Sequence, residues 1–175
     1  MDLEISGKVA LITGSNRGIG KATAITLSKE GVNIALLARN EDLLIETKDE
    51  ISKISPDIKI EYFICDTKDN EQVRKTVLEV EKIFGKIDIL VNCAAALPEE
   101  SNLENFDEDK LFEQIDVKVS GYIRCAKNVA PIMKKNGWGR IINISGLNAR
   151  SSANLIGSIR NISVSSMTKN LADNL

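Results

Sequence analysis

Short apolar runs alternate along the chain with longer stretches in which apolar residues recur every three or four positions. The apolar runs predict strands at residues 8–13, 33–38, 59–65, 87–92 and 140–144. The periodic stretches predict helices at residues 17–30, 40–52, 70–84, 109–135 and 158–175. Strands that alternate with helices form a parallel sheet covered on both faces, through right-handed crossovers. The pattern therefore predicts an α/β fold with three α/β/α layers around a doubly wound parallel sheet.

Two details of the pattern qualify this architecture. Pro131 is expected to end or kink the last turn of the long helix at residues 109–135, because proline lacks the N–H that a helix interior requires. A dinucleotide-binding fold of two halves has six strands, whereas the pattern here predicts fewer. We therefore expect one domain over residues 1–175, truncated before the last strands of the usual arrangement.

Composition and charge exclude several classes of function. The 175 residues are 43% hydrophobic and 27% charged, with a net charge of −2 and a pI near 5.4, so we expect no nucleic-acid partner. No apolar run approaches the roughly 18 residues of a membrane span. The absence of histidine excludes His-based triads and imidazole zinc sites, and we expect no metal centre. The cysteines are odd in number and widely spaced, at Cys65, Cys93 and Cys125, and the first residues do not resemble a secretory leader. These features predict reduced thiols in a cytoplasmic protein.

A glycine-rich turn joins the first expected strand to the first expected helix. Residues 13–20 read T-G-S-N-R-G-I-G. Glycine allows a sharp turn and a close approach of the backbone to a ligand, and the helix that follows directs free N–H groups at a phosphate. We interpret the turn as the pyrophosphate site of a dinucleotide, the alternative being a tight turn and nothing more. Its candidate cofactor-binding residues are Gly14, Ser15, Asn16, Arg17, Gly18, Ile19 and Gly20.

The residues after the second expected strand bear on the choice of cofactor. A carboxylate at this point would bind the ribose 2′-hydroxyl and repel a 2′-phosphate, but Ala38 and Arg39 stand there instead. Arg17, in the glycine turn, supplies a second guanidinium, and two such groups can fork onto one phosphate. The pattern favours NADP over NAD. The alternative is that both arginines are solvated surface residues.

The spacing T-G-x-x-x-G-x-G resembles that of the short-chain dehydrogenase/reductase family, and further marks of the family follow in order over residues 1–175. These are C-D at residues 65–66, N-C-A-A at residues 92–95 and the expected strand that ends near Ser145. The resemblance implies a Rossmann fold and an oxidoreductase that moves hydride between a nicotinamide cofactor and a small carbonyl or alcohol substrate. It also implies that Asp66 contacts adenine and that Asn92 braces the central strand, and it places Asn92 and Ala94, after the fourth strand, among the cofactor-binding residues. The alternatives are a strand-end turn for Asp66 and a backbone cap for Asn92.

The chain departs from this family at the catalytic tyrosine and lysine. The family uses a tyrosine followed four residues later by a lysine, but neither Tyr62 nor Tyr122 has a lysine at that distance. Aligning T-K-N-L-A at residues 168–172 places Gly157 at the tyrosine position and Asn161 at the lysine position. A slip of one residue would place Ser158 and Ile162 there. Ser145 matches the family serine, although Gly146 competes for that position.

A second departure accompanies the first. The segment D-V-K-V-S-G at residues 116–121 resembles the family's D-V-N-x-x-G, with Lys118 in place of the catalytic asparagine. We hypothesise a reciprocal exchange, in which Lys118 and Asn161 keep one ammonium and one amide in the same pocket. Lys118 would hold the nicotinamide ribose or donate a proton; the alternative is a solvated helix lysine. Tyr122, one turn further on, either reaches the pocket or packs inside the fold. The candidate catalytic residues are therefore Ser145, Lys118 and Asn161, with Ser158 or a water as other proton sources.

Three hypotheses follow from these residues, and the first two assign a function to the protein. The first is an NADP-dependent oxidoreductase with an atypical active site, and the second is a non-catalytic NADP-binding sensor or scaffold. The third is a truncated domain that keeps only a cofactor half-site. The resemblance also implies a homodimer or homotetramer, paired through the long helix and the last helix. Apolar residues available for such pairing, or equally for the core, are Val117, Val119, Ile123 and Val129.

Overall fold

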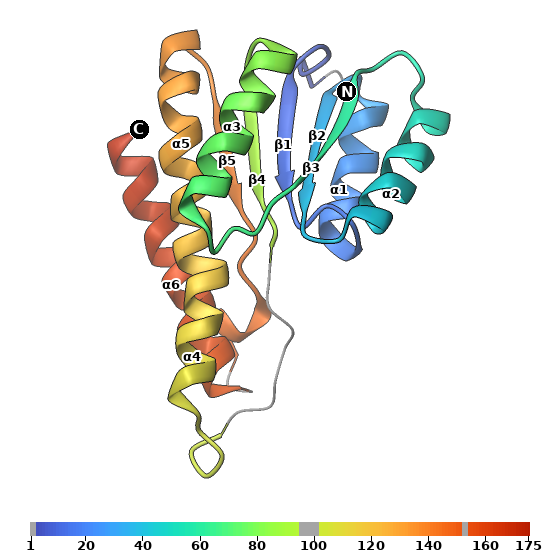
Figure 1. The fold of residues 1–175 in the computed structure, drawn as a ribbon. Coiled ribbons are helices and arrows are strands. Elements are labelled where there is room, and N and C mark those ends of the chain that lie inside the picture. Colours follow the sequence, from blue (N-terminus) through green and yellow to red (C-terminus); the bar gives the residue numbers. More distant parts are fainter. Residues whose placement is uncertain (1–2, 95–101, 152–153) are drawn as a thin grey trace.

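A parallel five-stranded sheet forms the centre of the computed structural model, which describes residues 3–94, 102–151 and 154–175 (Figure 1). The strands are β1 (Val9–Thr13), β2 (Asn33–Ala38), β3 (Ile60–Ile64), β4 (Ile89–Asn92) and β5 (Arg140–Asn143), in the order β3-β2-β1-β4-β5. All four neighbouring pairs are parallel. The order reverses beside β1, so the doubly wound architecture that the alternating pattern predicts is confirmed.

Helices cover both faces of the sheet. They are α1 (Gly18–Lys29), α2 (Glu41–Ile54), α3 (Asn70–Phe84), α4 (Glu108–Ile115), α5 (Gly121–Asn136) and α6 (Leu155–Asn174). Residues of α1 and α2 share one buried apolar cluster with Ala10 and Ile12 of β1, whereas α3 and α5 share the other with Leu11. Because successive strand residues point to opposite faces, β1 supplies both clusters and is buried on both sides (Figure 1).

Local capping explains where the helices around the sheet begin and end. The side chain of Asn40 accepts a hydrogen bond from the Leu43 N–H at the start of α2, and Asp69 accepts two at the start of α3. Gly85 ends α3 in the left-handed conformation, with φ at 79°. These are the residue types that satisfy the unpaired groups at helix ends.

The long helix differs from its prediction. It is interrupted at η1, a π-helical turn over Asp116–Ser120, while α5 continues through Pro131 to Asn136. Pro131 therefore does not end the helix, whose last residue, Asn136, lies one position beyond the predicted end at residue 135. Tertiary packing explains the difference, because Ala130 and Ile132 on either side of the proline are buried. The helix stops instead at Gly137, whose φ is 70°.

The last helix begins earlier than its periodicity predicts. Its first residue is Leu155, and the side chain of Asn154 accepts a hydrogen bond from the Gly157 N–H as a cap. Among the helices of the described segments, none is both long and apolar enough to cross a membrane. Cys65, Cys93 and Cys125 are free thiols.

Candidate functional site

The glycine turn between β1 and α1 is packed so closely at Gly14 and Gly20 that neither position has room for a side chain. Gly14 has a φ of 64°, and a Cβ built there would lie 2.9 Å from the Cα of Ala94. A Cβ at Gly20 would overlap the carbonyl group of Gly14. Arg17 occupies the cap position of α1 without a side-chain cap bond, so the first N–H groups of the helix have no cap from this side chain. Uncapped N–H groups at the positive end of a helix are a site for a phosphate.

Two hydroxyl groups fasten this turn to its neighbours. The Ser15 hydroxyl accepts a hydrogen bond from the Leu37 N–H at 2.8 Å, which ties the turn to β2. The Thr13 hydroxyl accepts from the N–H groups of Cys93 and Ala94, at 2.9 and 3.0 Å, and ties it to the segment after β4. Ser15 is therefore buried behind the turn rather than facing a ligand. Sequence reasoning did not single out Thr13, although it precedes the first glycine.

A cleft of about 790 Å³ opens at the carboxyl ends of the strands. Clefts at this edge of a doubly wound sheet, beside the point where the strand order reverses, are the usual ligand sites of such folds. The cleft is lined by most of the predicted cofactor-binding residues and by two of the predicted catalytic ones: Gly14, Asn16, Arg17, Gly18, Ile19, Gly20, Arg39, Asp66, Ala94, Lys118 and Ser145. Residue 95 of the predicted motif at 92–95 lies outside the described residues.

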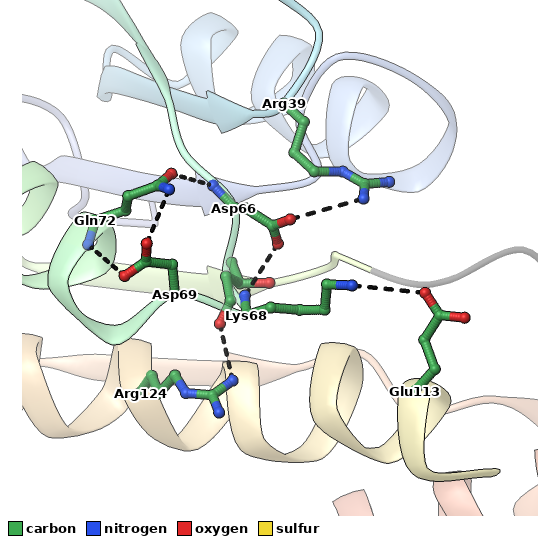
Figure 2. A network of polar contacts seen from close by, with 8 residues as sticks. Arg39, Asp66, Lys68, Asp69, Gln72, Glu113 and Arg124 are labelled. Carbon is green, nitrogen blue, oxygen red and sulfur yellow. Dashed lines mark hydrogen bonds and ion pairs between the residues drawn. The ribbon is translucent and has the colours of Figure 1, made fainter. Parts of the chain in front are cut away.

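One end of the cleft carries a pair of opposite charges. The Arg39 guanidinium lies 3.8 Å from the Asp66 carboxylate, and 69% of the Arg39 side chain is exposed (Figure 2). The other Asp66 oxygen accepts a hydrogen bond from the Lys68 N–H at 3.0 Å, and the Gln72 side chain accepts one from the Asp66 N–H. Asp66 is thus held in a turn, while the contact that the described segments give Arg39 is an exposed ion pair, which is weak. Arg17 lines the same cleft.

The loop that carries Asp66 is fastened to the helix that carries Lys118 (Figure 2). The Arg124 guanidinium donates to the Thr67 carbonyl at 3.1 Å and to the Asp116 carboxylate at 2.7 Å. A Cβ at Gly121 would lie 3.0 Å from the Thr67 hydroxyl, so this helix approaches the loop closely. Arg124 bridges the first residue of η1 and the β3–α3 loop. No local sequence pattern indicated this role.

Lys118, Asn161 and Ser145 form one hydrogen-bonded cluster at the other end of the cleft. The Lys118 Nζ donates to the Ser145 carbonyl at 2.8 Å and to the Asn161 Oδ1 at 3.1 Å, and the Ser145 hydroxyl donates to the Asn161 carbonyl at 2.8 Å. Lys118 is only 4% exposed, which excludes the alternative of a solvated helix lysine. The ammonium and the amide of the hypothesised exchange therefore lie in direct contact, although Asn161 itself does not line the cleft.

The Lys118 amine lies in an environment that disfavours its charge. Burial, together with the nearby Arg160 guanidinium, lowers the pKa of Lys118 to about 8. Its hydrogen-bond partners are neutral, and no carboxylate among the described residues pairs with it or with Arg160. Arg160 donates to the side chain of Gln114, while its buried Nε lacks a partner. A fraction of Lys118 is therefore uncharged near neutral pH.

Asparagine side chains occupy the space beside Gly157, which the motif alignment places at the family's tyrosine position, and beside Gly146, which competes with Ser145 for the serine position. A Cβ at Gly157 would lie 2.7 Å from the Nδ2 of Asn148 and 3.1 Å from the Oδ1 of Asn154. A Cβ at Gly146 would lie 2.5 Å from the Nδ2 of Asn161. The Asn161 amide thus takes the room that a side chain at residue 146 would need.

Two further candidates serve the fold rather than the cleft. Tyr122 is buried, its hydroxyl donates to the Ile144 carbonyl at 3.2 Å, and burial raises the pKa of Tyr122. Asn92 is buried at the end of β4, and its Nδ2 donates to the Tyr122 carbonyl and to the Asn143 side chain. Tyr122 therefore packs inside the fold, and Asn92 braces β4 against β5 and α5.

Comparison with known proteins gives the class to which this site belongs. The family described as short chain dehydrogenase matches residues 8–159, so the chain belongs to that family. A 7alpha-hydroxysteroid dehydrogenase of Clostridium sardiniense is 34% identical over 172 residues, which cover 96% of this chain and 65% of the relative. A 3alpha-hydroxysteroid dehydrogenase of Mediterraneibacter gnavus is 29% identical over 147 residues, which cover 84% and 58%. The chain thus spans about six tenths of the length of these curated relatives.

Solved structures resemble the fold closely. The L-sorbose reductase of Gluconobacter frateurii, complexed with NADPH and L-sorbose, matches with a TM-score of 0.93 and 31% identity over 99% of this chain and 66% of the other. A NAD⁺-bound xylitol dehydrogenase matches with a TM-score of 0.93 and 28% identity over 98% and 66%. Both of these structures hold a nicotinamide cofactor, one phosphorylated on its adenosine ribose and one not.

Proposed function

We propose that this protein is an NADP-dependent oxidoreductase that transfers hydride between the nicotinamide cofactor and a small carbonyl or alcohol substrate. The observation that carries the proposal is that the N-terminus of α1 and the Lys118 cluster share one cleft. Membership of the short chain dehydrogenase family supports it, as do the NADPH and NAD⁺ complexes of the two similar structures.

The residues of the cleft fit such a cofactor. Gly14 and Gly20 leave no room for side chains where the backbone must approach a pyrophosphate, and the N–H groups at the start of α1 would bind it. Arg17 and Arg39 would bind the 2′-phosphate of NADP, since the position at the end of β2, where a carboxylate would repel it, holds Ala38 and Arg39. Asp66 would contact the adenine and, by pairing with Arg39, hold that guanidinium beside the cleft.

The Lys118 cluster would supply the proton that the family normally takes from tyrosine. The bound cofactor supplies or accepts the hydride. With a pKa of about 8, Lys118 is mostly protonated at pH 7 yet gives up its proton far more easily than an ordinary lysine. Ser145 and Asn161 hold the Nζ in place through their two hydrogen bonds. Positioned proton transfer of this kind contributes roughly 10²–10⁴-fold to rate.

A non-catalytic NADP-binding sensor or scaffold is the second candidate. It is favoured by Gly157, since Asn148 and Asn154 fill the space beside the residue that replaces the family's tyrosine. Cofactor binding is common to both candidates, whereas turnover separates them.

We further propose a cytoplasmic homodimer or homotetramer of one domain. Exposed apolar residues on α5 and α6, Ile123 and Ile162, supply contact surface for a second copy. Val129 is buried in the core and is not available for such a contact.

Oxidation of NADPH over a panel of ketones, aldehydes and quinones tests the proposal. We expect turnover that falls by at least about 100-fold in Lys118→Met, because the general acid is lost. The exposed Lys127→Met is the matched control and should keep the parent rate. Binding of NADPH without turnover of any compound would favour the sensor, and absence of both would refute the proposal.

A further inference from the structure

The hydrogen bonds of Lys118 accommodate a neutral amine as well as an ammonium. Its Nζ has two acceptors, the Ser145 carbonyl at 2.8 Å and the Asn161 Oδ1 at 3.1 Å. A protonated lysine carries three N–H donors, whereas a neutral one carries two and a lone pair. Two acceptors therefore satisfy the neutral form completely, and the structure of the described residues gives its lone pair no donor. Lys118 and Ser145 line the cleft, so the amine belongs to the wall of a ligand-sized space.

The surroundings of Lys118 favour the neutral form. A lysine becomes a nucleophile when it is removed from water or placed near another cation. Lys118 meets both conditions, because it is buried and lies near the Arg160 guanidinium, and no described carboxylate pairs with either group. With the pKa lowered to about 8, roughly a tenth of Lys118 is neutral at pH 7, which is about 300-fold more than for a lysine of unperturbed pKa.

We propose that Lys118 is a nucleophile that forms a Schiff base with a small aldehyde or ketone bound in the cleft. The nitrogen lone pair attacks the carbonyl carbon and forms a C–N bond, while the carbonyl π electrons move to oxygen. The proton that nitrogen sheds neutralises this oxygen, a second proton converts it to water, and water leaves as the C=N bond forms. One carbonyl compound and one ammonium thus give one protonated imine and one water. The step needs no oxidant or reductant, so it goes beyond the proposed hydride transfer and does not depend on it.

The thiols of the cleft are less suited to this reaction. Cys65 and Cys93 also line it, but burial raises the pKa of both thiols. The thiolate is the reactive form of cysteine. The structure therefore assigns the reaction with carbonyl compounds to Lys118.

Reductive trapping tests this assignment. The chain is incubated at pH 7 with propanal and sodium cyanoborohydride, without nicotinamide cofactor, and propylated lysines are located by peptide mass spectrometry. We expect Lys118 to be labelled at least about tenfold faster than the exposed Lys127 and Lys169, because of its larger neutral fraction. The rate at Lys118 should rise with pH to a plateau with a midpoint near 8. Labelling of Lys118 at or below the rate of the exposed lysines would overturn the proposal.

Variants of Arg160 test the physical cause. In Arg160→Gln the neighbouring cation is gone, so labelling of Lys118 at pH 7 should fall several-fold and its midpoint should move upward. Arg160→Lys keeps a cation and should retain most of the parent rate. An unchanged rate and midpoint in Arg160→Gln would contradict the role given to Arg160. Because cyanoborohydride replaces NADPH as reductant, a failure of the chain to bind NADPH would leave this result unaffected, and the two proposals fail separately.

Discussion

Replacing Lys118 by methionine measures how much stability the fold loses by burying an amine beside η1. Lys118 is 4% exposed, and its pKa of about 8 lies below that of an unfolded lysine. Between these two values the unfolded chain binds more protons than the folded one, so the stability of the parent protein rises with pH through this window. Below the folded pKa both states are protonated and the full penalty is present.

The size of the effect follows from the shift. Each pKa unit corresponds to about 1.4 kcal/mol. A shift from 10.5 to about 8 therefore costs about 3 kcal/mol at pH 7, of which about 2 kcal/mol is recovered by pH 9.5. The methionine in Lys118→Met does not titrate. Between pH 7 and pH 9.5 the stability of this variant relative to the parent protein should therefore decline by about 2 kcal/mol.

Urea denaturation of both proteins at pH 7 and pH 9.5 provides the assay, because titrations shared by the two proteins cancel in the difference. The exposed Lys127→Met is the matched control, since removing a solvated charge changes stability by only about 0.5 kcal/mol. We expect the difference between parent and Lys118→Met to move by about 2 kcal/mol in favour of the parent at the higher pH. A difference that is equal at both pH values, or that moves the other way, would refute a lowered pKa at Lys118.

Three further changes test other parts of the account. A double-mutant cycle combines Lys118→Asn with Asn161→Lys and measures the free energy of unfolding in urea. The double variant should be more stable than the sum of the two single losses predicts, by at least about 1 kcal/mol, whereas strict additivity would contradict the exchange. Gly20→Ala should lower stability by about 1–3 kcal/mol in the same assay, because its Cβ would overlap the carbonyl group of Gly14; an unchanged midpoint would show that the turn relaxes. Arg124→Met should lower the free energy of unfolding by about 1–3 kcal/mol and Arg124→Lys by less, because methionine has no donor for the Thr67 carbonyl and lysine keeps one. Equal losses of stability in thermal unfolding would argue against this contact.

The fold was predictable because its signals are local. The strand Asn33–Ala38 and the helix Asn70–Phe84 have the bounds that their hydrophobic patterns predict, and Gly85 marks the end of the latter in both sequence and structure. The π-helical turn at Asp116–Ser120 was not predictable, because it lies where tertiary contacts from Arg124 hold the chain. The periodic pattern did carry the helix past Pro131 to residue 135, close to its observed end at Asn136.

The candidate site was predictable where spacing alone decides which residues meet. Lys118 and Asn161 are 43 residues apart in sequence, yet the matched motifs placed them together and their side chains are in contact. The direction of a side chain was harder to predict: Ser15 stands at the expected position, but its hydroxyl turns toward the backbone of β2. The half-buried Arg160 was missed, because its proximity to Lys118 depends on how α6 packs against η1.

Calorimetric titration of the chain with NADPH and NADH tests the central claim, which is that this cleft holds a phosphorylated nicotinamide cofactor. We expect NADPH to bind at least about tenfold more tightly than NADH, and this difference should be largely lost in Arg39→Ala. Arg74→Ala is the control and should keep the difference, because Arg74 is an exposed arginine on α3 that pairs with Glu71. Equal binding of the two nucleotides would contradict the role given to Arg39. Absence of heat from both would contradict the cofactor site itself.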